Sequence, residues 1–75
     1  MICKRIRNLR EDMDMTQQNM ADKLFINRRT YSSYEIGARG IPIEILSQIA
    51  DIFNTSTDYL IGRTDTKKPY PKKKQ

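Results

Sequence analysis

Apolar residues in this chain recur at helical spacing in short runs, and each run is closed by a capping residue or a glycine. In the first run, Ile2, Ile6, Leu9 and Met13 fall at i, i+4, i+7 and i+11, which is one stripe along a helix. No stretch alternates as a strand would, and there are no internal repeats. The pattern predicts an all-α fold of five helices, with Pro42 near the start of the fourth. The expected ranges are 2 to about 13, about 17–24, about 28–35, about 42–53 and about 56–61.

Capping residues and glycines set the expected helix boundaries. Thr16 is a suitable N-cap for the second helix, but Asn19 is not the Glu or Gln that completes a capping box. Asn27 can cap the third helix, and Gly37 ends it. The second and third helices are therefore short and are joined by only three residues, Phe25 to Asn27, which is the spacing of a helix-turn-helix.

The charge of the chain is unevenly distributed. Its 75 residues are enough for one small domain. The net charge is +5, yet residues 1–66 carry nine basic and nine acidic side chains, and the other five lysines all lie in 67–75. We therefore expect one domain over 1–66 and a short, basic, disordered tail over 67–75. The tail could attract polyanions without sequence preference or simply aid solubility.

Several kinds of site are excluded by residue types that are missing. Cys3 is the one cysteine and there is no histidine, so neither an internal disulfide nor a Cys/His zinc site can form. No phosphate-binding glycine loop or nucleophile–base pair is found, so we expect no enzyme, cofactor, metal or small-molecule ligand. Without an apolar run of about 18 residues or a signal peptide, we expect a cytoplasmic protein that does not enter a membrane.

The helix-turn-helix spacing belongs to a longer series of landmarks. These are Leu9-Arg10, Thr16-Gln17, Ala21, Leu24, Ser32, Glu35, Gly37, Pro42, Leu46, Ile49-Ala50 and Asp58-Tyr59-Leu60. In this order and spacing, residues 5–63 resemble the phage-repressor and Cro type helix-turn-helix family, also called XRE. The number of landmarks makes the resemblance specific. It implies a repressor-like, five-helix domain that binds double-stranded DNA and regulates transcription, most often as a repressor.

The resemblance also implies roles for particular side chains. The third helix is expected to enter the major groove with its N-terminus first, so that its earliest side chains meet base edges. The expected base-contacting residues are Arg28, Arg29, Ser33 and Ser32. Arginine recognises O6 and N7 of guanine, so each half-site should hold at least one guanine. The expected phosphate-contacting residues are Gln17, Asn27, Arg39 and Arg7, which would set register without reading sequence.

Two further positions have structural meaning in the family. Arg10 and Glu35 are expected to form a semi-buried ion pair that holds the third helix against the first. Phe25 stands where the family usually has glycine, in a turn that favours a left-handed backbone. Either the turn differs slightly here, or the Phe25 side chain gains enough packing to offset the strain.

The same resemblance implies the partners of this fold. Such domains usually bind as homodimers, because two half-sites about 34 Å apart multiply affinity and specificity. The expected dimer surface includes Ile52, Tyr59 and Ile61. Tyr31 and Tyr34 could stack on DNA, but their i, i+3 spacing favours the core. The competing interpretation is a protein-interaction module or antitoxin built on the same scaffold.

Overall fold

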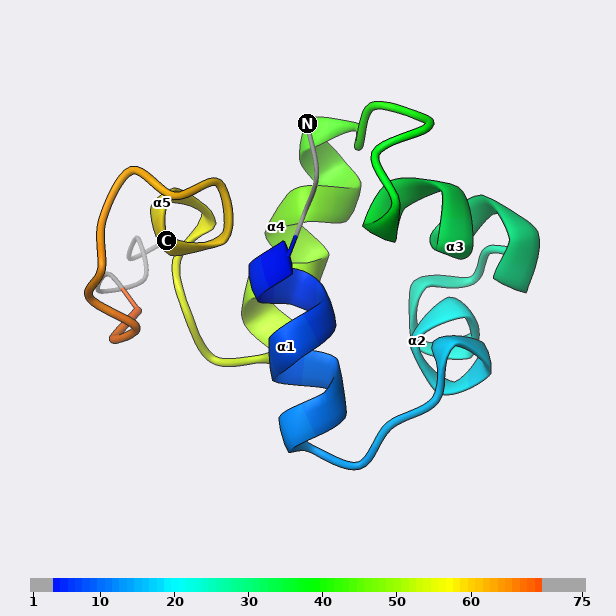
Figure 1. Ribbon diagram of the computed structural model, residues 1–75, viewed down its shortest axis with the longest axis horizontal. Helices are drawn as coiled ribbons and strands as arrows, with labels where there is room; N and C mark the ends of the chain where they lie inside the picture. The colour runs from blue at the N-terminus through cyan, green and yellow to red at the C-terminus, as the bar shows by residue number, and fades with distance from the viewer. Residues whose placement is uncertain (1–3, 70–75) are drawn as a thin grey trace, which may run out of the picture.

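The computed structural model describes residues 4–69, so the expected start of the first helix at Ile2, Cys3 and residues 70–75 of the tail lie outside the described range. Five helices follow one another along the chain. They are α1 (Lys4–Asp12), α2 (Gln17–Leu24), α3 (Arg28–Glu35), α4 (Ile43–Ile52) and α5 (Thr57–Leu60). The described residues contain no strand, which confirms the all-α, five-helix fold. In Figure 1, α1 and α4 lie at the centre, with α2 and α3 on one side and α5 on the other.

Side chains close the helix N-termini largely as the sequence indicates. Thr16 Oγ1 accepts a hydrogen bond from the Asn19 N–H at 3.0 Å, and Asn19 Oδ1 accepts one from the Thr16 N–H at 2.9 Å. The expectation of an incomplete capping box was therefore wrong, because the shorter asparagine side chain still reaches back to the Thr16 backbone. Asn27 caps α3 by accepting from the Thr30 N–H at 2.7 Å.

The fourth helix begins one residue later than its proline. Pro42 is the N-cap, in an extended conformation with φ −59° and ψ 147°, and its carbonyl accepts the first helical bond from the Leu46 N–H at 2.9 Å. Proline at this position sacrifices no hydrogen bond, because the first N–H groups of a helix have no partner within the helix. Gly37, which ends α3, has φ 77°, a left-handed value that glycine adopts without steric cost.

One apolar core joins all five helices. Tyr31 and Tyr34 are buried, which confirms core packing as their role. Each large apolar side chain that leaves water contributes about 1.5–3 kcal/mol to stability, and this burial holds the inner face of α3 in place. The buried apolar residues are Ile6, Met20, Ala21, Leu24, Tyr31, Tyr34, Ile49, Ala50, Phe53 and Leu60.

The segment after α5 folds back onto the body. Arg5 Nη1 donates to the carbonyls of Tyr59 and Thr64, at 2.9 and 2.5 Å, and Arg5 Nη2 pairs with Asp65 at 2.7 Å. Thr55 Oγ1 donates to the Lys67 carbonyl at 2.6 Å. The first residue of the expected tail is thus hydrogen-bonded to the body. The division of the chain at 66 stays a prediction.

Within 4–69, no helix combines the length and apolar character needed to cross a bilayer. The same residues contain no cluster of three or more His, Cys, Asp or Glu side chains suited to a metal ion.

Candidate nucleic-acid interface

The turn between α2 and α3 is locked by backbone hydrogen bonds. The Phe25 N–H donates to the Asp22 carbonyl at 3.2 Å, and the Ile26 N–H donates to the Ala21 carbonyl at 3.0 Å. This pair of bonds is the Schellman motif, which requires a left-handed residue just after the helix. Phe25 supplies it with φ 57° and ψ 40°. The three-residue connection is therefore a standard helix-turn-helix turn.

Neither expectation for Phe25 was right. The turn keeps the left-handed backbone that glycine usually supplies, and the phenyl side chain gains no packing, because the residue is 93% exposed. A side chain with a Cβ in this conformation is strained relative to glycine by about 1–2 kcal/mol. Within the described part of the chain, the fold tolerates this strain without using the ring.

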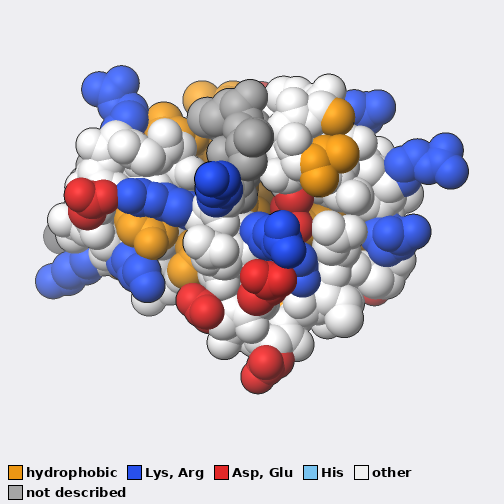
Figure 2. All heavy atoms as spheres, viewed as in Figure 1, with side chains coloured by type: hydrophobic (Ala, Val, Ile, Leu, Met, Phe, Trp, Pro, Cys, Tyr) orange, Lys and Arg blue, Asp and Glu red, His pale blue; other side chains and the backbone are white. Residues whose placement is uncertain are grey.

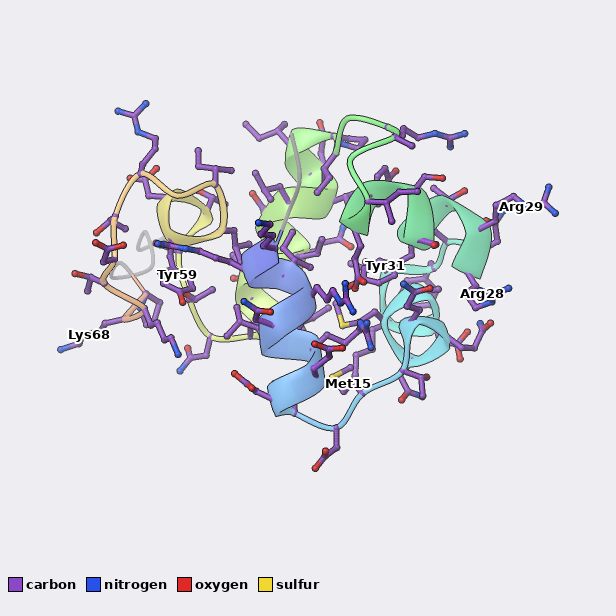
Figure 3. The ribbon with its side chains drawn as sticks, in the orientation of Figure 1. Met15, Arg28, Arg29, Tyr31, Tyr59 and Lys68 are labelled. Carbon is purple, nitrogen blue, oxygen red and sulfur yellow. The ribbon has the colours of Figure 1, made fainter. Side chains whose placement is uncertain are left out.

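Arg28 and Arg29 lie in the first turn of α3 and are both exposed. Figure 3 shows both side chains pointing away from the body at the end of α3 that follows the turn. Figure 2 shows basic side chains on this side of the molecule and also on the opposite side. No hydrogen bond or ion pair within residues 4–69 holds either guanidinium group. Their donors are therefore available to a ligand, and the fork of each group matches a guanine edge or a phosphate.

The other polar residues of α3 are partly engaged. Ser33 Oγ donates to the Arg29 carbonyl at 3.0 Å, one turn back along the helix. Ser32 is half-buried. The Asn27 side-chain oxygen is used by the helix cap, which leaves its amide nitrogen free to donate. The hydroxyl of Ser33 still has lone pairs to offer, but the arginines are the more accessible groups.

The expected phosphate contacts from Gln17 and Arg7 meet at one depression beside α2. The depression has a volume of about 450 Å³, and its lining includes Lys4, Arg7, Gln17 and Ile36. Arg7 Nε lies 3.5 Å from Glu11 Oε2 in an exposed i, i+4 pair, which is a weak interaction that an anion could displace.

Arg39 stands apart from this depression. It is exposed in the loop between α3 and α4, and the described residues give its side chain no ion pair. The loop backbone bends tightly here, because the N–H groups of Ala38 and Arg39 both donate to the Ser33 carbonyl, at 3.0 and 3.3 Å. The guanidinium group of Arg39 has no ion pair among the described residues and can therefore donate to a ligand at this end of α3.

Arg10 and Glu35 form a two-point ion pair beneath the surface. Arg10 Nε lies 2.7 Å from Glu35 Oε2, and Arg10 Nη2 lies 3.2 Å from Glu35 Oε1. The two side chains are only 12% and 2% exposed. Arg10 Nη1 also donates to the Met15 carbonyl at 2.8 Å, and Gln17 Nε2 donates to Glu35 Oε1 at 3.1 Å. One network therefore ties α1, the start of α2 and the end of α3 together.

The network also sets the ionisation of Glu35. Burial alone would raise the pKa of this carboxyl, but the hydrogen bonds from Arg10 and Gln17, together with the nearby Tyr31 hydroxyl, outweigh burial and lower the pKa. Burial, followed by the nearby Glu35 carboxylate, raises the pKa of Tyr31, so its hydroxyl stays neutral. The Tyr31 hydroxyl lies close enough to Glu35 to influence its pKa, but it makes no hydrogen bond within residues 4–69.

Sequence reasoning missed two features of this surface. The first is the attachment of Gln17 to Glu35, which leaves only one of the two Gln17 amide hydrogens for a ligand. The second is the role of Arg5, for which the sequence predicted no contact. Its partners lie 54 to 60 residues away along the chain, and no local pattern signals such contacts.

Comparison with known proteins agrees with this geometry. A helix-turn-helix family model matches residues 6–60, which include α2, the turn and α3. The chain belongs to the helix-turn-helix family. Two HTH-type transcriptional regulators of Bacillus subtilis are similar to it. YobD is 32% identical over 99% of this chain and 66% of its own length, and YqaE is 37% identical over 93% and 60%.

A phage protein is among the relatives of this helix-turn-helix chain. The CTXphi transcriptional repressor RstR of Vibrio cholerae is 41% identical over 87% of this chain and 58% of its own length. The chain thus spans about 60% of the length of several curated relatives that it matches. No solved structure matches it significantly.

Proposed function

We propose that this domain binds double-stranded DNA in a sequence-specific manner and regulates transcription as a repressor. The observation that carries the proposal is the exposed pair Arg28 and Arg29, free of protein partners within residues 4–69, at the N-terminus of the second helix of a helix-turn-helix. A recognition helix reads base edges with this end. The names of the relatives, which are transcriptional regulators and a phage repressor, support the same function.

In the proposed complex, Arg28 and Arg29 contact guanines, and Ser33 and Ser32 make smaller contacts to bases or phosphates. Phosphates on either side of α3 would be held by the expected contacts from Gln17, Asn27, Arg39 and Arg7. The Asn27 amide nitrogen and the remaining Gln17 amide hydrogen are free for this purpose. These groups lie at the N-termini of α2 and α3, where free N–H groups and the helix dipole favour anions.

We propose that the functional unit is a homodimer in the cytoplasm. A single recognition helix reads too few base pairs to select one site in a genome. Ile52, Tyr59 and Ile61 remain the proposed dimer surface, and each is half-buried in the single chain, so part of each side chain is left for a partner. If the protein is a monomer at high concentration, both with and without DNA, the proposed dimer is contradicted.

The direct test is selection of duplexes from a random DNA pool by the full chain. Wild-type protein should enrich a site with guanines in each half. Arg28→Ala and Arg29→Ala should each relax preference at a particular base position, by about 1–3 kcal/mol. Arg63→Ala is the matched control, because Arg63 is also exposed but follows α5, on the opposite side of the molecule from α3 (Figure 1). It should leave the selected site unchanged.

A protein-interaction module or antitoxin is the alternative. It predicts that the chain enriches no sequence and that both reading-helix variants behave as wild type. If purified chain ignores duplexes of every sequence at low salt, DNA recognition is refuted and this alternative is favoured. The free arginine pair argues for the DNA reader, because an apolar contact surface would have no need of two adjacent guanidinium groups on α3.

A further inference from the structure

Phe25 is the most exposed large apolar side chain among the described residues. Its backbone conformation is one that glycine would adopt without strain, and its ring makes no use of the core. Both facts disfavour phenylalanine at this position in the isolated domain. The side chain is therefore best explained by a contact made outside the domain.

The position of Phe25 indicates what that contact is. The Schellman motif fixes its backbone, and Asn27 and Arg28, at the start of α3, follow it by two and three residues. Three exposed cations, Lys23, Arg28 and Arg29, and one exposed anion, Asp22, flank it in sequence, which leaves a net positive charge there. A surface with these charges attracts a polyanion, and Phe25 is continuous with the end of α3 that enters the groove in the proposed function.

Duplex DNA offers one apolar group on its major-groove edge, the C5-methyl of thymine, and phenylalanine is among the side chains that contact it. Phosphates and guanine edges have nothing to offer a phenyl ring. We propose that Phe25 packs against a thymine methyl beside the bases met by Arg28 and Arg29, and so selects thymine at that position. This inference rests on the proposed DNA-binding function and adds a second, apolar element to its specificity.

The experiment removes the thymine methyl group and the Phe25 ring separately. In the duplex that wild-type chain selects, each thymine is replaced in turn by deoxyuridine, which lacks only the methyl group. Wild-type binding should weaken about fourfold at one thymine in each half-site, the effect of losing one buried methyl. Phe25→Gly should bind the parent duplex at least fourfold more weakly and should be indifferent to deoxyuridine at that position.

Two controls keep the result interpretable. Phe25→Gly should melt at the same temperature as wild type or higher, because glycine relieves the left-handed strain. Asn54→Gly alters another left-handed residue, at φ 53° after α4, and should retain both wild-type affinity and sensitivity to deoxyuridine.

Each failure has a distinct meaning. If no duplex is selected, the proposed function fails. If a duplex is selected but no thymine is sensitive to deoxyuridine, the thymine contact is overturned, even where Phe25→Gly binds less well. A melting temperature for Phe25→Gly well below that of wild type would also overturn it, because the ring would then be serving the fold.

Discussion

Removal of the Glu35 carboxylate tests the network that holds the reading helix. The substitution Glu35→Ala leaves the Arg10 guanidinium, only 12% exposed, without its two-point partner. Arg10 keeps one hydrogen bond, to the Met15 carbonyl. Gln17 also loses its partner, but its half-exposed side chain can be hydrated. The main effect is therefore a partly buried charge without a counter-charge.

The expected cost follows from that burial. Breaking one partner of a buried pair costs about 3–5 kcal/mol, and the remaining Arg10 bond favours the lower end. For a domain of this length, the whole free energy of unfolding is roughly 4–11 kcal/mol. A loss of about 3 kcal/mol would lower Tm by roughly 10–25 °C. The reading arginines keep their local backbone, so base preference should change little at a temperature where the variant is folded.

Thermal and urea unfolding of three variants checks this reasoning. Glu35→Ala and Arg10→Met should each be strongly destabilised, whereas the double variant Arg10→Met with Glu35→Leu should recover much of the loss, because no unpaired charge remains. The reasoning is refuted if Glu35→Ala loses less than about 1 kcal/mol, or if it is stable but selects a different DNA site. A double variant no more stable than the single ones would show that the pair itself, not the stranded charge, carries the effect.

The remaining predictions concern pH, the core and the C-terminal segment. Because folding lowers the pKa of Glu35, the ionised carboxylate contributes its full stabilisation above the ordinary pKa of 4.5, and this contribution is lost as the pH falls toward the folded pKa. The Tm of Glu35→Gln should therefore depend less on pH in this range, and an unchanged pH profile would contradict the assignment. Tyr31→Phe should change stability by less than about 0.5 kcal/mol in urea unfolding, since the hydroxyl has no full hydrogen bond in the described structure; a loss above 1 kcal/mol would mean that it is bonded. Arg5→Ala should lower the free energy of unfolding by about 1–2 kcal/mol, because two backbone carbonyls and the Tyr59 ring, 4.3 Å away, lose their partner. Asp65→Asn should lower it by less than about 0.5 kcal/mol, because Asp65 is 98% exposed. Equal losses in the two variants would contradict this difference. Deletion of residues 67–75 should weaken binding to all duplexes alike and reduce its salt dependence, and a selective loss at the preferred site would count against a non-specific tail.

Local sequence signals determined most of the secondary structure. The ranges expected for α2 and α3 agree with the structure at both ends, because caps at Thr16 and Asn27 and a glycine at 37 mark the boundaries through hydrogen bonds made within four residues. The fourth helix was placed one residue early, since proline favours the first helical position but here serves as the N-cap. The apolar stripes also identified Tyr31 and Tyr34 as core residues.

Tertiary structure decided what these helices bring together. Whether the strained Phe25 side chain would be buried or exposed depended on the surface that α2 and α3 leave uncovered, and the residue alone could not tell. The bonds from Gln17 to Glu35 and from Arg5 to the segment after α5 join residues 18 and up to 60 positions apart. Periodicity and capping act over one or two turns, whereas such contacts depend on how the helices pack, which is why they became visible only in the folded chain.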